Sequence, residues 1–136
     1  MNESGPIKSH RDLIVWQKAV QLVVVLYDLT KGFPREEIYG LVSQIRRAAT
    51  SIPANIAEGQ GRRLKGEYQH FLGNARGSLW ELDTHIEVSF QLAFITEPQY
   101  QATRAQMDEI GRMLNGLMRS ISDSYLPPPL PLASNI

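Results

Sequence analysis

The segment QIRRAATSIPANIAEGQGRR, residues 44–63, decides the fold class of this chain. Its apolar and polar residues each recur every three or four positions, which is the repeat of an α-helix with one buried and one polar side. Pro53 lies inside this pattern, where a proline costs about 3 kcal/mol in a free helix. The segment therefore predicts a kinked helix that neighbouring helices stabilise and that ends at Gly59. Its apolar side comprises Ile45, Ala48, Ala49, Ile52 and Ile56, and its polar side comprises Gln44, Arg47, Ser51, Asn55 and Glu58.

Three further helical patterns surround this segment, and no stretch alternates apolar and polar residues convincingly enough to predict a strand. Capping signals support two of the starts, one at Ser9 with Asp12 and one at Thr96 with Gln99. The first helix should bury a stripe formed by Leu13, Trp16, Val20, Val23 and Tyr27. The four predicted helices run from Ser9 to Gly32, from Glu36 to Gly59, from Leu64 to Phe94 and from Thr96 to Ile121.

Short loops between these helices predict an all-α, antiparallel, up-down-up-down four-helix bundle, because that arrangement buries all four apolar stripes. Gly73 and Gly77 should permit a close helix approach, since an exposed helical glycine costs about 1 kcal/mol relative to alanine. The predicted organisation is an N-terminal tail (1–8), the bundle (9–124) and a proline-rich tail (125–136). In that tail, the spacing of Pro128 and Pro131 matches a PxxP ligand, although a solvated tail is the commoner outcome.

Composition narrows the class of protein. The chain has no cysteine, and its N-terminus lacks the cationic start and apolar run of a signal peptide. No apolar run approaches the roughly 20 residues of a membrane span. These features predict a cytoplasmic protein without membrane contact.

The formal net charge is zero, which argues against a surface that is basic throughout. The charges are nevertheless unevenly distributed. Residues 44–76 carry six Lys or Arg against two Asp or Glu, and residues 81–123 carry three against seven. Such a subunit suits either a phosphate contact at one end or head-to-tail docking on its own copies.

Catalytic and metal-binding patterns are weak. A metal site in a helical bundle requires inward glutamates and Glu-x-x-His pairs, whereas Glu81 and His85 are spaced by four and the first helix contributes no glutamate. The stretch GQGRR, 59–63, follows a helix and lacks the Gly-Lys ending of a phosphate loop, so a helix cap and turn is the better interpretation. The sequence predicts no enzyme activity, no cofactor and no metal.

Two sets of polar residues remain as candidates. Arg62, Arg63 and Lys65 fall at a helix junction, where the amino end of the next helix adds positive potential. They form a candidate nucleic-acid contact, and a solvated basic turn is the alternative. The second set should form a structural hydrogen-bond network between helices, with a ligand site as the alternative. It comprises Arg47, Asn55 and Glu58 with Arg76 and Glu81.

Six short blocks follow one another along the chain. They are DLIVWQKA (12–19), LTKGFP (29–34), YGL (39–41), QIRRAA (44–49), SIPANIAEG (51–59) and GSLWEL (77–82). In this order, over roughly residues 11–122, they resemble the bacterial family of 23S rRNA intervening sequence proteins. The resemblance implies a left-handed antiparallel four-helix bundle that assembles as a ring-shaped homopentamer and has no established catalytic residues. Similar proteins, the accessory variability determinants of diversity-generating retroelements, bind a reverse transcriptase and nucleic acid.

The residues and the resemblance together predict a non-enzymatic, ring-forming bundle that binds structured RNA or a nucleic-acid-bound protein. The contact would be a rim formed by Arg62, Arg63 and Lys65 of each copy. A protein-binding scaffold with no nucleic-acid role is the alternative.

Overall fold

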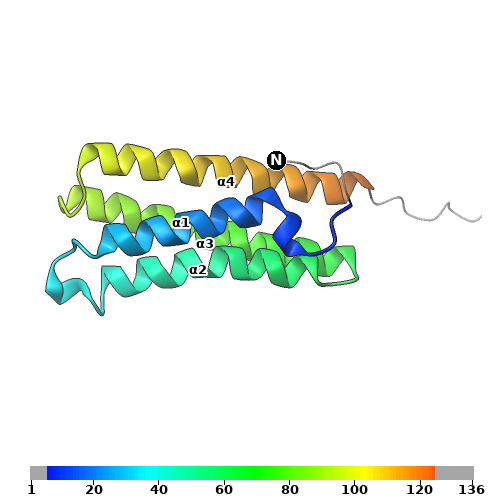
Figure 1. Ribbon diagram of the computed structural model, residues 1–136, viewed down its shortest axis with the longest axis horizontal. Coiled ribbons are helices and arrows are strands. Elements are labelled where there is room, and N and C mark those ends of the chain that lie inside the picture. Colours follow the sequence, from blue (N-terminus) through cyan, green and yellow to red (C-terminus); the bar gives the residue numbers. More distant parts are fainter. Residues whose placement is uncertain (1–5, 125–136) are drawn as a thin grey trace, which may run out of the picture.

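A computed structural model describes residues 6–124, and within them every regular element is helical (Figure 1). The predicted all-α four-helix fold is confirmed. Two short 3-10 helices, η1 and η2, accompany the four long ones, and the predicted tail 125–136 lies outside the described residues. The elements are η1 (His10–Asp12), α1 (Ile14–Thr30), η2 (Arg35–Glu37), α2 (Leu41–Gln60), α3 (Lys65–Gln91) and α4 (Glu97–Ser124).

Each long helix runs opposite to the one before it (Figure 1). Contacts between α2 and α3 show this order, because Arg47 bonds to Glu81 while Ser51, one turn later, bonds to Ser78. α1 packs on α2 and α4, and α3 packs on the same two helices, so α1 and α3 occupy diagonal corners of the bundle. The handedness of the bundle stays a prediction.

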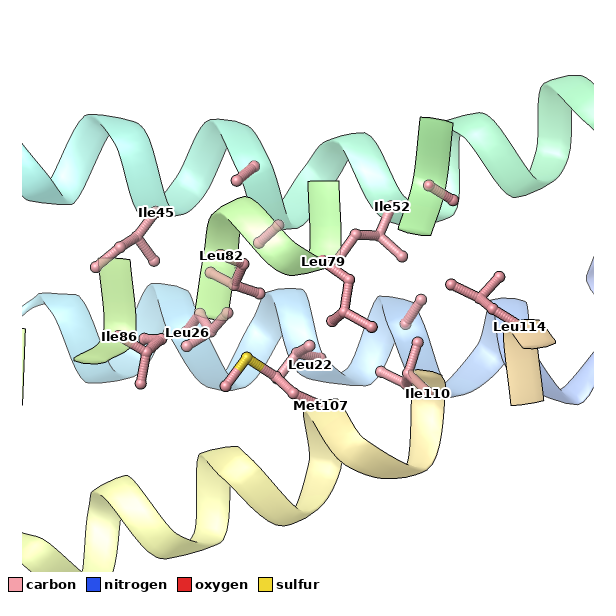
Figure 2. Close-up of a cluster of buried hydrophobic side chains, with 14 of the residues drawn as sticks. Leu22, Leu26, Ile45, Ile52, Leu79, Leu82, Ile86, Met107, Ile110 and Leu114 are labelled. Atoms are coloured by element: carbon pink, nitrogen blue, oxygen red, sulfur yellow. The ribbon is translucent and has the colours of Figure 1, made fainter. Parts of the chain in front are cut away.

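Aliphatic side chains from all four helices meet along the axis of the bundle (Figure 2). Leu22, Ile52, Leu82 and Leu114, one from each helix, have no solvent exposure. Burying such a side chain contributes about 1.5–3 kcal/mol. The core therefore explains why the amphipathic pattern, rather than any single capping contact, specifies the bundle.

Two helix starts lie later than predicted. Ser9 and Asp12 do form a capping box, but it closes the 3-10 turn η1, and α1 begins only at Ile14. Glu37 belongs to η2 and ends in a carboxylate whose Oε1 accepts the Leu41 amide at 3.1 Å. Glu37 thus caps the first turn of α2 from outside instead of forming it.

The buried stripe of α1 differs from the prediction by a rotation of the helix. Tyr27 is 40% exposed, whereas Val15, Ala19, Leu22 and Leu26 form the inner face. The apolar run 22–26 covers several sides of the helix, so its periodicity fits more than one stripe. Thr30 completes the inner face because its hydroxyl donates to the Leu26 carbonyl at 2.7 Å.

The glycines that permit close packing are not the predicted ones. A Cβ at Gly73 or Gly77 would have no atom within 4 Å, so neither glycine is required for contact between these helices. Gly59 is required, because a Cβ there would lie 3.0 Å from Phe71 Cβ and 3.2 Å from the Tyr68 carbonyl oxygen. The end of α2 and the start of α3 therefore approach each other more closely than a larger residue at position 59 would allow.

Candidate nucleic-acid interface at the basic end of the bundle

The three basic residues predicted to contact nucleic acid lie where α2 passes into α3. α2 ends where the Gly61 amide donates to the Ala57 carbonyl at 3.2 Å. Leu64, whose backbone is extended, then redirects the chain into α3. Arg62, Arg63 and Lys65 are all exposed. The N-cap residue of α3, Leu64, makes no side-chain capping bond, and the amino end of the helix adds positive potential beside Lys65.

Arg62 is already engaged within the chain. Its Nη2 lies 2.5 Å from Glu58 Oε2, and its guanidinium lies 4.9 Å from the centre of the Phe71 ring. These contacts orient the side chain, and Glu58 offsets its charge. The ion pair with Glu58 therefore lowers the share of the net positive charge that Arg62 contributes at this junction.

The fold brings further charges to the same end. The start of α1 and the end of α4 lie beside the α2–α3 junction (Figure 1), where Gln69 Nε2 donates to the Met118 carbonyl at 2.7 Å. Sequence reasoning missed these residues because they are distant along the chain, although antiparallel topology predicts that such helix ends meet. In residues 6–13, 58–70 and 117–122, hereafter the basic end, the bases are Lys8, Arg11, Arg62, Arg63, Lys65 and Arg119, and the acids are Asp12, Glu58 and Glu67.

One of these acids has a structural role. The Asp12 carboxylate accepts the backbone amides of Lys8 at 2.8 Å and of Ser9 at 3.2 Å. These hydrogen bonds lower the pKa of Asp12. Because these bonds favour the ionised carboxylate, Asp12 offsets part of the basic charge at this end, including that of Lys8.

The opposite end of the bundle is acidic. It contains the α1–α2 connection and the α3–α4 connection, which lie together in Figure 1. Charge is thus separated along the long axis of the bundle. The two sequence segments with unequal charge, residues 44–76 and 81–123, do not coincide with the two ends of the bundle. In residues 28–40 and 87–97 the acids are Asp28, Glu36, Glu37, Glu87 and Glu97, and the bases are Lys31 and Arg35.

The predicted polar network begins with an ion pair between α2 and α3. The Arg47 guanidinium bonds to the Glu81 carboxylate and, at 2.8 Å, to the side-chain oxygen of Gln44. His85 Nε2 lies 3.3 Å from the same Glu81 carboxylate. Partial burial raises the pKa of Glu81, but the hydrogen bonds from His85 and Arg47 outweigh it, so the pKa lies below its usual value.

The other predicted members make separate contacts. Asn55 Nδ2 donates to the Ser51 hydroxyl at 2.9 Å, and that hydroxyl is 2.9 Å from the hydroxyl of Ser78 on α3. Arg76 turns toward α4, where its Nη1 donates to Asn115 Oδ1 at 3.0 Å. With Glu58 bonded to Arg62, the five predicted residues form several local contacts and no single network. Sequence reasoning missed the partners Ser78, His85 and Asn115.

Metal-binding clusters and membrane-spanning helices are two other classes of feature. Among residues 6–124, no group of three or more His, Asp or Glu side chains is placed to hold a metal ion. In the same range, none of the helices combines the length and the apolar composition needed to cross a membrane.

Comparison with known proteins identifies the family. Residues 11–116 match the family of the 23S rRNA-intervening sequence protein. The chain belongs to this family. A search of the curated proteins finds no match.

One solved structure of the family is similar over most of its length. It is a crystal structure of a protein of unknown function from the S23 ribosomal protein family of Bacteroides thetaiotaomicron. The two chains are 25% identical and superpose with a TM-score of 0.73, covering 78% of this chain and 96% of the other. The similarity therefore extends over nearly the whole of the Bacteroides chain.

Proposed function

We propose that this 23S rRNA-intervening sequence protein is a non-enzymatic, ring-forming homo-oligomer that binds structured RNA through the basic end of each subunit. The separation of charge along the bundle carries the proposal, because a neutral chain that places its bases at one end can contact phosphates there. The description of the family by an rRNA element supports the choice of RNA.

Two exposed apolar surfaces support self-association. Val24 and Tyr27 lie on the outside of α1, and Val88 on α3 and Leu92 just after its end are exposed as well. Because α1 and α3 occupy diagonal corners, the two surfaces face in different directions. Contact between unlike surfaces of neighbouring copies is heterologous, and such contacts close into a ring when the rotation permits. A ring would gather the basic ends of all copies on one rim and strengthen weak RNA contacts through multivalency.

The experiment combines light scattering with RNA retention over a salt series. A structured hairpin RNA should be retained at low salt and released as salt rises, with a slope that reflects the phosphates neutralised. The double variant Arg63→Gln/Lys65→Gln should reduce that slope, because each lost phosphate contact removes about 0.7–0.9 from it. This variant spares Arg62 and its bond to Glu58.

The matched control removes two positive charges from the acidic end, as Lys31→Gln/Arg35→Gln. It should bind RNA with the affinity and salt slope of the parent protein. Equal loss in both double variants would assign binding to overall charge, and unchanged binding in the Arg63/Lys65 variant would contradict the proposed contact. A monomer in light scattering would contradict the ring.

A second candidate is a protein-binding scaffold without RNA contact. It is favoured by the turn before α2, where Tyr39 is 94% exposed and Ile38 is also exposed. Such a contact would show little salt dependence and would be lost in Tyr39→Ser, whereas that change should leave RNA retention intact.

A further inference from the structure

The outer surface between α3 and α4 contains a groove that the basic end does not include. It encloses about 310 Å³. Its floor includes Leu79 and Met107, and Gly111 keeps it open, because a Cβ there would lie 3.4 Å from Leu79 Cδ2. Trp80, Arg112 and Asn115 form walls of the groove. The groove therefore offers an apolar floor, with donors from Arg112 and Asn115 and the carboxylates of Asp83 and Asp108 along its edge.

Trp80 stands out among these residues because 62% of its surface is exposed. It is one of only two tryptophans in the chain. The Arg76 guanidinium lies over the Trp80 ring, 5.2 Å from the centre of the ring. The Nε of Arg76 is buried and has no hydrogen-bond partner among the described residues. An exposed indole beside an unsatisfied donor suits a ligand with an apolar face and free carbonyl oxygens.

We propose that the proline-rich segment of the same chain, Leu126–Leu132, docks in this groove with Pro128 and Pro131 beside Trp80. A segment of this composition favours the polyproline II conformation, which leaves its carbonyl oxygens without internal hydrogen bonds. Aromatic-lined grooves bind such segments by packing against the prolines and donating to the carbonyls. Trp80 supplies the aromatic surface, and Arg112 and Asn115 supply the donors.

The reach of the segment supports this groove. α4 ends at Ser124, so at 1.5 Å per residue Asn115 and Gly111 lie about 14 and 20 Å back along the helix. In polyproline II geometry, at about 3.1 Å per residue, Pro128 and Pro131 lie about 12 and 22 Å beyond Ser124. Before the residues of the turn are counted, a segment that turns back along α4 therefore spans the stretch of this helix from Asn115 to Gly111, which lines the groove, with one proline near each end of it.

A different cavity is too distant for the segment. The cavity lined by Phe33, Pro34 and Ile38 lies at the acidic end, and α4 spans about 42 Å between the two ends. All of 125–136, fully extended as polyproline II, covers only about 37 Å before any turn is counted. The groove at Trp80, by contrast, has an aromatic wall and lies within reach of the segment.

Fluorescence of Trp80 tests the proposal. In a Trp16→Phe background, Trp80 is the only tryptophan, so its emission and its quenching by acrylamide report on the groove. Truncation after Ser124 should shift the emission to longer wavelength and increase quenching, because it removes the prolines. Truncation after Leu132 is the matched control, and it should leave both readings unchanged. Circular dichroism verifies that both shortened proteins keep their helix content.

A synthetic peptide of residues 125–136, added to the protein truncated after Ser124, should restore the shielding of Trp80. The same peptide with Pro128→Ser and Pro131→Ser should not. Equal quenching of the full-length and truncated proteins would overturn the proposal, since the segment would then leave Trp80 uncovered. Shielding that increases with protein concentration would assign the groove to a second copy and would also overturn it.

Discussion

The two interfaces of α3 differ in how the helices are held together. Against α2, small residues such as Ala48, Ala49 and Gly59 are buried, and Gly59 lies against Phe71 and Tyr68. Against α4, long side chains bridge the helices: Arg104 Nη1 lies 2.7 Å from Asp83 Oδ1, and the rings of Tyr100 and Phe90 stack at 4.1 Å. Both interfaces contain an ion pair, Arg47 with Glu81 and Arg104 with Asp83, but the first also has the close approach at Gly59 and the second an aromatic stack.

This difference affects what each interface can tolerate. Close packing of small residues leaves no space for added atoms, because protein interiors are packed to crystal-like density. Long bridging side chains at a partly exposed interface can be exchanged with smaller losses, because water replaces part of each contact. The looser packing of α3 against α4 also explains why a groove is present between them, where Gly111 faces Leu79.

The largest expected effect is that of Gly59→Ala. The new Cβ would lie 3.0–3.2 Å from Phe71 and Tyr68, including a backbone oxygen that cannot rotate away. The free energy of unfolding should fall by about 1–3 kcal/mol, as for other overpacked sites. Urea unfolding followed by circular dichroism measures the change.

Gly73→Ala is the matched control on α3. Its Cβ would meet no atom within 4 Å, so the higher helix propensity of alanine should raise stability by up to about 1 kcal/mol. If Gly59→Ala were as stable as Gly73→Ala, close packing between α2 and α3 would not be the feature that distinguishes this interface.

Features that depend on neighbouring residues could be predicted from the sequence, and contacts between distant residues could not. The segment 44–63 and the capping box of Thr96 with Gln99 are local patterns, and the structure confirms the helix and the box. The inner face of α1 was predicted only in part: Trp16 and Val23 pack against the core, but Tyr27 is exposed, because the run of valines fits more than one stripe. Arg76 was assigned to the wrong interface because its partner, Asn115, lies 39 residues away. No local pattern contains that information.

The candidate site shows the same limit. Arg62, Arg63 and Lys65 could be grouped because they are neighbours in sequence, but Lys8 and Arg119 join them only when the bundle is assembled. The bond between Glu58 and Arg62 was missed for a different reason. Their spacing of four fits an ion pair on one helix face, yet Arg62 follows the last residue of α2, so helical spacing alone did not suggest it.

A smaller effect is expected for the ion pair between Arg104 and Asp83. Both side chains are partly exposed, so Arg104→Gln or Asp83→Asn should lower the free energy of unfolding by about 0.2–1 kcal/mol. The double variant should lose less than the sum of the single variants, because the two residues share one contact. Additive losses would show that the pair contributes nothing as a pair, and the α3–α4 interface would then depend on its aromatic stack.

The smallest effects concern two carboxylates of α3 in acid. The pKa of Glu81 is lowered at the α2 side, where hydrogen bonds from His85 and Arg47 outweigh burial, and the pKa of Glu87 is lowered at the α4 side by the hydroxyl of Tyr100 and the amide of Gln91. Each folded pKa lies below the unfolded value, so each group stabilises the protein above that value, near 4.5, and loses this contribution as the pH falls through the folded pKa.

Glu81→Gln and Glu87→Gln should therefore each weaken the dependence of the unfolding midpoint on pH between about pH 6 and pH 3. The effect of added salt should differ between the two carboxylates. Glu81 pairs with a charged guanidinium, so added salt should reduce its contribution, whereas the neutral donors Tyr100 and Gln91 should make that of Glu87 nearly independent of salt. Equal salt sensitivity of the two variants would mean that both interfaces of α3 hold their carboxylates by charge, and the distinction between them would then rest on packing alone.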